Sequence, residues 1–401
     1  MNLEIIAAPD SFKGSLGSLQ AAEAIKRGIL KEVPEASVVL IPIADGGEGT
    51  VDAFLASVGG SRVLVRATGP LGGEVEAFYG VLDNGCTAVV EAAAACGLHL
   101  LRPEERDPFR ATTRGVGEIL LHAVSRGCRR IILGVGGSAT NDGGSGMLRA
   151  LGARFLDGSG CEIPEGARGL ENLAGIDLSG WLWPSSGLEV VLAADVKNPL
   201  CGTNGASFVY GPQKFPPDAP PSEADLRALD SALERMARVS AGVLGRDLSG
   251  AEGAGAAGGL GFAAMAFLGA SVRPGAELVL EAARFDERLA EADLVFTGEG
   301  SIDSQTLFGK AVMRVCSAAA RRGVPVVALA GSIDADEGVL RQLGLSAWAS
   351  IAVGPSSLSE MCADAELLLE RVAAGVMRWL NLGSLLAAKP RRGVPHQAEG
   401  G

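Results

Sequence analysis

The stretch 130–146, RIILGVGGSATNDGGSG, joins a short apolar run to a loop that contains six glycines. A strand that ends in a glycine-rich loop before a helix is typical of α/β proteins, in which main-chain amides at such a turn hold an anion. Gly134, Gly136 and Ala139 fit the dinucleotide pattern G-x-G-x-x-[GA], and Asp157 lies near the spacing of a ribose contact. An NAD-dependent oxidoreductase is therefore one candidate.

The residues that follow Ala139 favour a different enzyme. They read TNDGGSG, and each of these three glycines would cost about 1 kcal/mol inside a helix. We therefore expect the helix to begin only near Gly144. A longer loop that presents Ser138, Thr140 and Asn141 beside an aspartate suits a phosphate with its metal better than a flat pyrophosphate.

The rest of the chain alternates apolar runs with helical patterns, which is the signature of a parallel sheet covered on both faces. Residues 62–92 differ, because three short strand patterns joined by tight turns predict an antiparallel meander. We predict two α/β domains. One is a doubly wound, flavodoxin- or Rossmann-like parallel-sheet domain formed by residues 1–60 and 285–382, and it is split by an inserted mixed α/β domain, residues 61–284. Residues 383–401 lack periodicity and predict a flexible tail.

The composition is that of a soluble globular protein. The 401 residues are 47% apolar and 20% charged, and their net charge of −12 disfavours nucleic acid or a membrane as partners. Seven cysteines without paired spacing, and no N-terminal signal pattern, predict a cytoplasmic protein. Residues 253–272 carry no charge but are rich in glycine, so we expect a loop and a buried helix there and no membrane span. Three histidines are too few to favour a Ser-His-Asp triad or a multi-histidine metal centre.

Carboxylates recur after nearly every predicted strand. Ligands of open α/β sheets bind outside the carboxyl ends of the strands, so these residues are the candidates for a site. Together they could supply the metal ligands, anion contacts and base of a phosphoryl transferase. A non-catalytic metabolite-binding protein is the other alternative, although it leaves these carboxylates unexplained. The candidates are Asp10, Ser11, Lys13, Asp45, Glu48, Ser138, Thr140, Asn141, Asp195, Lys197, Asn198, Glu299, Ser301 and Asp303.

Seven ordered motifs together resemble the class I glycerate kinases. They are APDSFKGSL, PIADGGEGT, GVGGSATNDGGSGML, AADVKNPLCG, GPQK, GAAGGLGF and FTGEGSIDSQT, and the similarity extends from residue 3 to about 380. The resemblance implies ATP-dependent phosphorylation of D-glycerate in a cleft between two α/β domains, with the 2-phosphate favoured over the 3-phosphate. It also implies ATP and Mg²⁺ as cofactors, small-molecule partners and a bacterial cytoplasmic enzyme, and we expect a monomer or a homodimer.

Chemistry suggests a role for each candidate. Asp195 is the favoured base, and Lys13 and Lys197 are expected to contact phosphate or carboxylate groups, because both substrates are anions in an acidic protein. The alternatives for holding Mg²⁺ are Asp45 with Glu48, or Glu299 with Asp303. The remaining candidates are expected to line the substrate or its phosphates, namely Asp10, Ser11, Ser138, Thr140, Asn141, Asn198 and Ser301.

Overall fold

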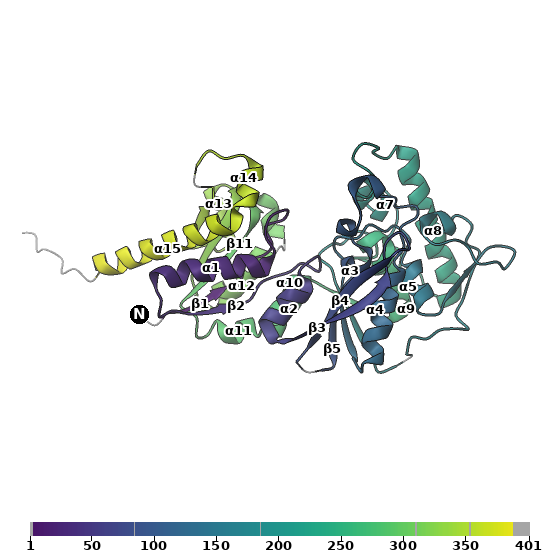
Figure 1. Ribbon diagram of the computed structural model, residues 1–401, viewed down its shortest axis with the longest axis horizontal. Helices are drawn as coiled ribbons and strands as arrows, with labels where there is room; N and C mark the ends of the chain where they lie inside the picture. The colour runs from purple at the N-terminus through teal and green to yellow at the C-terminus, as the bar shows by residue number, and fades with distance from the viewer. Residues whose placement is uncertain (1–2, 84, 185, 309–310, 353, 388–401) are drawn as a thin grey trace, which may run out of the picture.

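The computed structural model describes residues 3–83, 85–184, 186–308, 311–352 and 354–387. Its first sheet is fully parallel, with the strand order β13-β12-β11-β1-β2. Two of its strands come from the start of the chain and three from its last third, so the chain leaves this sheet and later returns to it (Figure 1). The strands are β1 (Glu4–Ala7), β2 (Ser37–Leu40), β11 (Leu294–Ile302), β12 (Val326–Ile333) and β13 (Ala347–Ser350).

Helices cover both faces of the first sheet because its strands alternate their side chains between two apolar clusters. In β1, Ile5 packs with α1 (Ser18–Glu32) and α15 (Ala365–Ala387), whereas Ile6 packs on the opposite face with α12 (Ala311–Arg322). The helices α1 and α15 lie side by side (Figure 1), and a Cβ at Gly28 would overlap the main chain of α15. The shorter helices of this unit are α11 (Phe285–Arg288), α13 (Glu337–Gln342) and α14 (Leu358–Ala363), with the 3₁₀ turn η5 (Ser304–Phe308) after β11.

The second sheet is mixed, with the strand order β10-β9-β6-β5-β4-β3. In this order β10, β9, β6 and β5 are parallel neighbours, whereas β5, β4 and β3 are antiparallel neighbours. The meander expected over 62–92 is confirmed. The strands are β3 (Gly60–Thr68), β4 (Glu74–Leu82), β5 (Thr87–Glu91), β6 (Arg130–Gly134), β9 (Glu189–Ala193) and β10 (Ser271–Arg273), and β7 (Arg154–Leu156) pairs with β8 (Gly175–Asp177) as a separate ribbon.

Among the described residues, the α-helices α3 to α9 complete this second unit, and the longest of them, α8, begins at a capping box in which Ser222 and Asp225 bond reciprocally. The expected loop and buried helix over 253–272 appear as the turn η4 (Ala256–Gly259) and α9. In the part of the chain that the structure describes, no helix has the length and apolar character needed to cross a bilayer. The helices are α3 (Ala93–Cys96), α4 (Arg114–Ser125), α5 (Ser145–Ala150), α6 (Ala167–Leu170), α7 (Ala206–Tyr210), α8 (Glu223–Leu244) and α9 (Leu260–Leu268).

Two helices lie between the sheets, α2 (Thr50–Val58) and α10 (Gly275–Ala282) (Figure 1). They contact each other, α2 also contacts β4 and β5, and α10 contacts α12. One apolar cluster therefore includes residues of both sheets, among them Val191 and Val295. The predicted fold class, two α/β units with one split in sequence, is confirmed. The exact domain limits at 60, 61–284 and 285–382 stay a prediction, and α2 packs on the second sheet although that division assigns it to the first.

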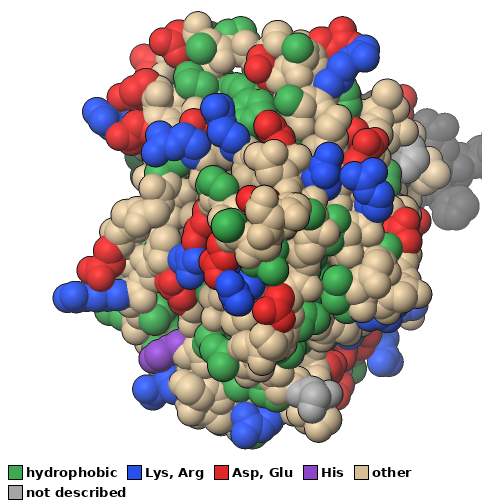
Figure 2. Space-filling model, turned by 90° about the vertical axis from the view of Figure 1, so that its right-hand side faces the viewer, with side chains coloured by type: hydrophobic (Ala, Val, Ile, Leu, Met, Phe, Trp, Pro, Cys, Tyr) green, Lys and Arg blue, Asp and Glu red, His purple; other side chains and the backbone are tan. Residues whose placement is uncertain are grey.

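The carboxyl end of the chain differs from the expectation of a flexible tail. The helix α15 continues through Ala387, so residues 383–387 are helical, and residues 388–401 lie outside the described part of the chain. On the face shown in Figure 2, which is that of the second unit, acidic and basic side chains are interspersed. That the protein does not bind nucleic acid stays a prediction from its acidic net charge.

Candidate active site

The glycine-rich loop after β6 is held together by Asp142. This fully buried carboxylate accepts hydrogen bonds from the amide and hydroxyl of Thr113, both at 2.9 Å, and from the amides of Gly144 and Gly146, both at 3.0 Å. Gly144 has a φ of 75° and directly precedes α5, so the predicted late helix start is confirmed. The amides at this helix start bond within the protein, which differs from the anion cradle that the glycine pattern suggested.

Glycines also let the loops after three strands touch each other. The amide of Gly136 donates to the carbonyl of Gly46 at 2.9 Å, and a Cβ at Gly46 would overlap the carbonyl of Ala193. These contacts join the loops that follow β2, β6 and β9, although β2 belongs to the first sheet and the others to the second. Asp45 and Asp195, which follow two of these strands, are thereby brought to one place.

A cavity of about 510 Å³ opens at this place, lined by loops of both sheets. Eight of the residues predicted from strand ends meet in it, seven from β11 and the loops of the first sheet and one, Asp195, from the second sheet. Their roles in binding or catalysis stay a prediction. The lining residues are Asp10, Ser11, Lys13, Asp45, Asp195, Glu299, Gly300, Ser301, Asp303, Ala311, Ser332 and Leu358.

This cavity, which is the larger of two that adjoin each other, is strongly acidic. Burial, and next the negative charge of Asp45, raise the pKa of Asp10 to about 7. Lys13 is the cation among the lining residues, its Nζ lies 3.3 Å from Asp45 Oδ2, and that carboxylate raises the pKa of the lysine. Glu299 is buried and accepts a hydrogen bond from the hydroxyl of Thr306 at 2.9 Å. Several carboxylates lie close together here with little positive charge to balance them, and this arrangement favours the binding of a cation.

The carboxylates of this cavity fit a Mg²⁺ site only when a bound substrate supplies some of the metal ligands. Within the described ranges, no three His, Cys, Asp or Glu side chains are placed to hold a metal ion by themselves. Mg²⁺ in nucleotide sites is commonly held by one or two carboxylates together with phosphate oxygens and water. Asp45, Glu299 and Asp303 line the larger cavity and can serve in this way. Glu48 does not line it, because its Oε1 lies 3.2 Å from Nδ1 of His99.

A second, smaller cavity of about 190 Å³ adjoins the first, and Asp45 and Asp195 line both. Most of its wall comes from the second unit. Asp195 is accessible to solvent, but it lies in the concave cleft, where desolvation and the charge of Asp45 raise its pKa to about 6. The other lining residues are Val135, Gly136, Gly137, Ser138, Ala193, Ala194, Val196, Tyr210, Gln213, Lys214, Ala256 and Ala257.

Lys214 was not predicted as a site residue, although it ends the GPQK motif. Its side chain is 2% exposed and lines the smaller cavity from the 3₁₀ turn η3 (Pro212–Lys214). Its Nζ donates to the carbonyl of Thr140 at 2.6 Å, and burial lowers its pKa to about 8. The signal that could have identified it is the lysine itself, since the protein contains few lysines and this one follows a Gly-Pro turn.

Besides Glu48, four predicted residues line neither cavity. Thr140 and Asn141 are fully buried beneath the smaller cavity, where Asn141 Nδ2 donates to the hydroxyl of Ser207 at 3.1 Å. Asn198 accepts the hydroxyl of Tyr210 at 2.6 Å and so positions a lining residue. Lys197 points to solvent, with 80% of its side chain exposed, and pairs with Glu252 at 3.5 Å.

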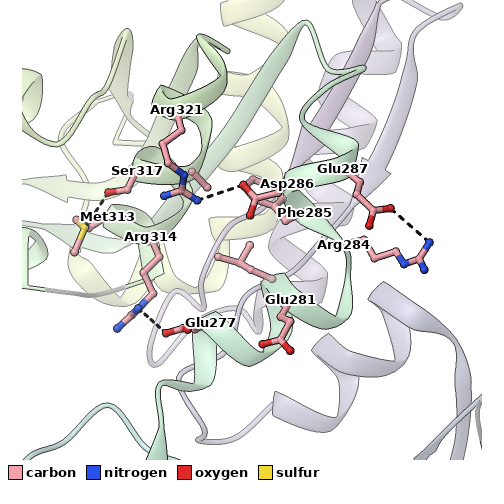
Figure 3. Close-up of a pocket in the computed structure, with 12 residues that line it drawn as sticks. Glu277, Glu281, Arg284, Phe285, Asp286, Glu287, Met313, Arg314, Ser317 and Arg321 are labelled. Atoms are coloured by element: carbon pink, nitrogen blue, oxygen red, sulfur yellow. Dashed lines mark hydrogen bonds and ion pairs between the residues drawn. The ribbon is translucent and has the colours of Figure 1, made fainter.

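A third cavity, of about 620 Å³, lies elsewhere, between α10, α11 and α12 (Figure 3). Its arginines face carboxylates, with Arg314 3.2 Å from Glu277 and Arg321 3.3 Å from Asp286. No strand-end loop contributes to it. Its link to the cleft is electrostatic, because the charge of Arg314 lowers the pKa of Asp195 against the larger effect of burial.

Comparisons with known proteins show the family to which the chain belongs. The model of the glycerate kinase family matches residues 5–381. Glycerate kinase of Bacillus subtilis is 44% identical over 96% of this chain and 99% of its own length, and glycerate 2-kinase of Escherichia coli is 43% identical over 95% and 99%. The crystal structure of a Salmonella typhimurium LT2 protein assigned as glycerate kinase 2 superposes with a TM-score of 0.83 at 43% identity, covering 96% of this chain and all of that one. The resemblance seen in the seven motifs is confirmed, and the chain belongs to the glycerate kinase family.

Proposed function

We propose that this enzyme transfers the γ-phosphoryl group of ATP to D-glycerate in the cleft where the two cavities meet. The observation that carries this proposal is that Asp45 and Asp195 line both cavities, so that two separate ligands would adjoin at these carboxylates. Phosphoryl transfer requires the donor and the acceptor hydroxyl to be in line and close together, and two adjoining cavities supply that arrangement.

Asp195 is the proposed base for the acceptor hydroxyl. It follows β9 and stands at the junction of the cavities, and its pKa of about 6 lets it be ionised, and still moderately basic, at neutral pH. Burial and the charge of Asp45 raise this pKa, and the charge of Arg314 lowers it. In this role Asp195 accepts the hydroxyl proton as the oxygen bonds to phosphorus.

Mg²⁺ bound with the nucleotide would neutralise phosphate charge in the larger cavity. Asp45, Glu299 and Asp303 are the proposed ligands, because they line that cavity. Lys13 would contact a phosphate oxygen from the same wall, since its ammonium already faces the carboxylate of Asp45. Asp10, Ser11 and Ser301 complete that wall as polar contacts for the nucleotide.

The favoured product is 2-phosphoglycerate. The name of the Escherichia coli relative, glycerate 2-kinase, supports this position over the 3-hydroxyl. Phosphorus NMR of the product distinguishes the two isomers. The seven cysteines, which are scattered along the sequence without paired spacing, support action in a reducing cytoplasm.

The decisive experiment measures ADP release by the purified protein with ATP, Mg²⁺ and a panel of small hydroxy acids. We expect turnover that requires D-glycerate. Reduction of NAD by glycerate without ADP formation would instead establish the oxidoreductase alternative. Tight binding of glycerate without ADP formation would leave a metabolite-binding protein. Small-angle scattering with both substrates would in addition test whether the two units close on them, as expected for a kinase that must exclude water.

A further inference from the structure

Lys214 carries a buried positive charge that the described part of the chain does not neutralise. Its side chain is 2% exposed, and lysines are almost never fully buried without a partner. No carboxylate of the described residues lies within 4 Å of its Nζ, which donates a hydrogen bond to the Thr140 carbonyl. A buried ammonium without a counterion is costly unless a ligand brings the opposite charge.

The nearby carboxylate is already committed. The charge of Asp142 acts on Lys214, but its oxygens accept four hydrogen bonds from Thr113, Gly144 and Gly146 and so hold the glycine-rich loop. Asp142 is thus a structural anchor, and Lys214 keeps donor capacity toward the cavity that it lines.

The wall beside Lys214 is held in an unusual conformation. Ala257 has a φ of 51°, a left-handed conformation that is strained for a residue with a Cβ, and its carbonyl accepts the hydroxyl of Thr140 at 3.5 Å. A Cβ at Gly258 would overlap the carbonyl of Thr140, to which Lys214 donates. The loop before α9, Thr140 and Lys214 are therefore fixed against one another, as expected of a binding wall.

We propose that Lys214 binds the carboxylate of glycerate, which makes the smaller cavity the acceptor pocket and the larger cavity the nucleotide pocket. This inference rests on the proposed function. The smaller cavity measures about 190 Å³ against about 510 Å³, so it suits a three-carbon acid and not a nucleoside triphosphate. Ser138, Tyr210 and Gln213 add neutral hydrogen-bonding groups to its wall, whereas five carboxylates line the larger one. The hydroxyl-bearing end of the acid would then face Asp195.

Substitution of Lys214 by methionine tests the proposal, because Met keeps the length and removes the charge. We expect the KM for glycerate to rise about 10- to 100-fold, the loss typical of a charge-assisted hydrogen bond, while the KM for ATP stays within twofold. Lys31→Met is the matched control, since Lys31 lies on α1, pairs with Glu370 and is far from both cavities. It should leave both constants unchanged.

A second readout separates binding of the carboxylate from a structural role. Glyceramide, the uncharged amide of glycerate, should inhibit the wild type much more weakly than glycerate binds. In Lys214→Met the two ligands should differ by less than threefold, because the group that distinguishes them is gone. A raised KM for ATP alone, or a preserved preference for the acid over the amide, would overturn the proposal.

If Lys214→Met does not fold, calorimetry of glycerate binding to the wild type tests the proposal. Between pH 8 and 9.5 glycerate binding should take up a proton and weaken as pH rises, up to tenfold per unit, because the anion favours the charged lysine whose pKa is about 8. The surrounding titratable groups are Asp45, Asp142, Asp195, Cys96 and Tyr210. Asp195 titrates near 6 and Cys96 near 12, outside this window. Affinity independent of pH there would contradict the proposal, whereas a wild type that never turns over glycerate would refute the proposed function itself.

Discussion

The two sheets contribute opposite chemistry to one cleft. Loops of the first sheet bring carboxylates, with Asp10 and Glu299 buried in the larger cavity. Loops of the second bring glycines, small polar groups and the buried Lys214 to the smaller one. An acidic wall can bind a highly charged anion only through a cation, whereas a desolvated lysine binds a singly charged acid directly. The difference supports the proposal that this acidic protein binds two anions side by side.

Among the tests of this difference between the two walls, removal of divalent metal should have the largest effect on turnover. If the acidic wall works through Mg²⁺, excess EDTA should lower turnover to less than about one hundredth, because the nucleotide would face uncompensated carboxylates. Glycerate binding, measured by calorimetry without nucleotide, should be unaffected, since the smaller cavity needs no cation. Added Mg²⁺ in excess over EDTA should restore activity. Full turnover in EDTA would show that the acidic wall has another purpose.

Asp195→Asn should have the next largest effect. The change keeps the shape and removes the proton acceptor at the junction, so kcat should fall by roughly 10²–10⁴ with the KM for glycerate little changed. In the wild type kcat/KM should fall as pH drops below about 6, because protonation of Asp195 removes the base, and this acidic limb should be absent in the variant. Asp218→Asn, in an exposed loop, is the control for loss of charge. A wild-type kcat in Asp195→Asn would remove this residue from the mechanism.

Much of this site was predictable because parallel strands end at the same edge of a sheet. Asp10 and Lys13 follow β1, and Glu299 lies near the end of the neighbouring strand β11, so they meet as the strand order requires. The late start of α5 was also predictable, because glycines resist helix at Gly143 and Gly144.

Other features depend on tertiary contacts that no local pattern encodes. Lys214 follows no strand, and its burial arises because η3 packs on the loop of Thr140. Glu48 and Lys197 follow strands in the sequence, as residues of a binding site in such a sheet do, but their side chains turn toward His99 and Glu252 respectively. The packing of α2 on the second sheet likewise depends on which face its apolar residues meet, which sequence periodicity leaves open.

Lys13→Ala should weaken nucleotide binding moderately. Lys13 supplies positive charge on the acidic wall, and we expect the KM for ATP to rise about tenfold, or about 1.4 kcal/mol, with the KM for glycerate within twofold. The effect is limited because 78% of the side chain is exposed, so solvent screens the charge. Lys31→Ala provides the control for a surface lysine. If only the KM for glycerate rises, the larger cavity would be the acceptor pocket and the smaller cavity the nucleotide pocket.

Lys197→Ala should have the smallest effect, although the sequence places Lys197 two residues after Asp195 and makes it as good a candidate as Lys13. Both partners of its ion pair are exposed, 80% for the lysine and 72% for Glu252, and such pairs contribute at most about 1 kcal/mol. Because the ammonium lies outside both cavity walls, we expect kcat and both KM values to change less than threefold in steady-state assays. A tenfold change in the KM for either substrate would mean that the loop after β9 moves when substrates bind and turns Lys197 inward. In that case small-angle scattering should show that the two sheets move closer together when substrates bind. The ammonium of Lys197 would then lie between the acidic wall and the wall that carries Lys214.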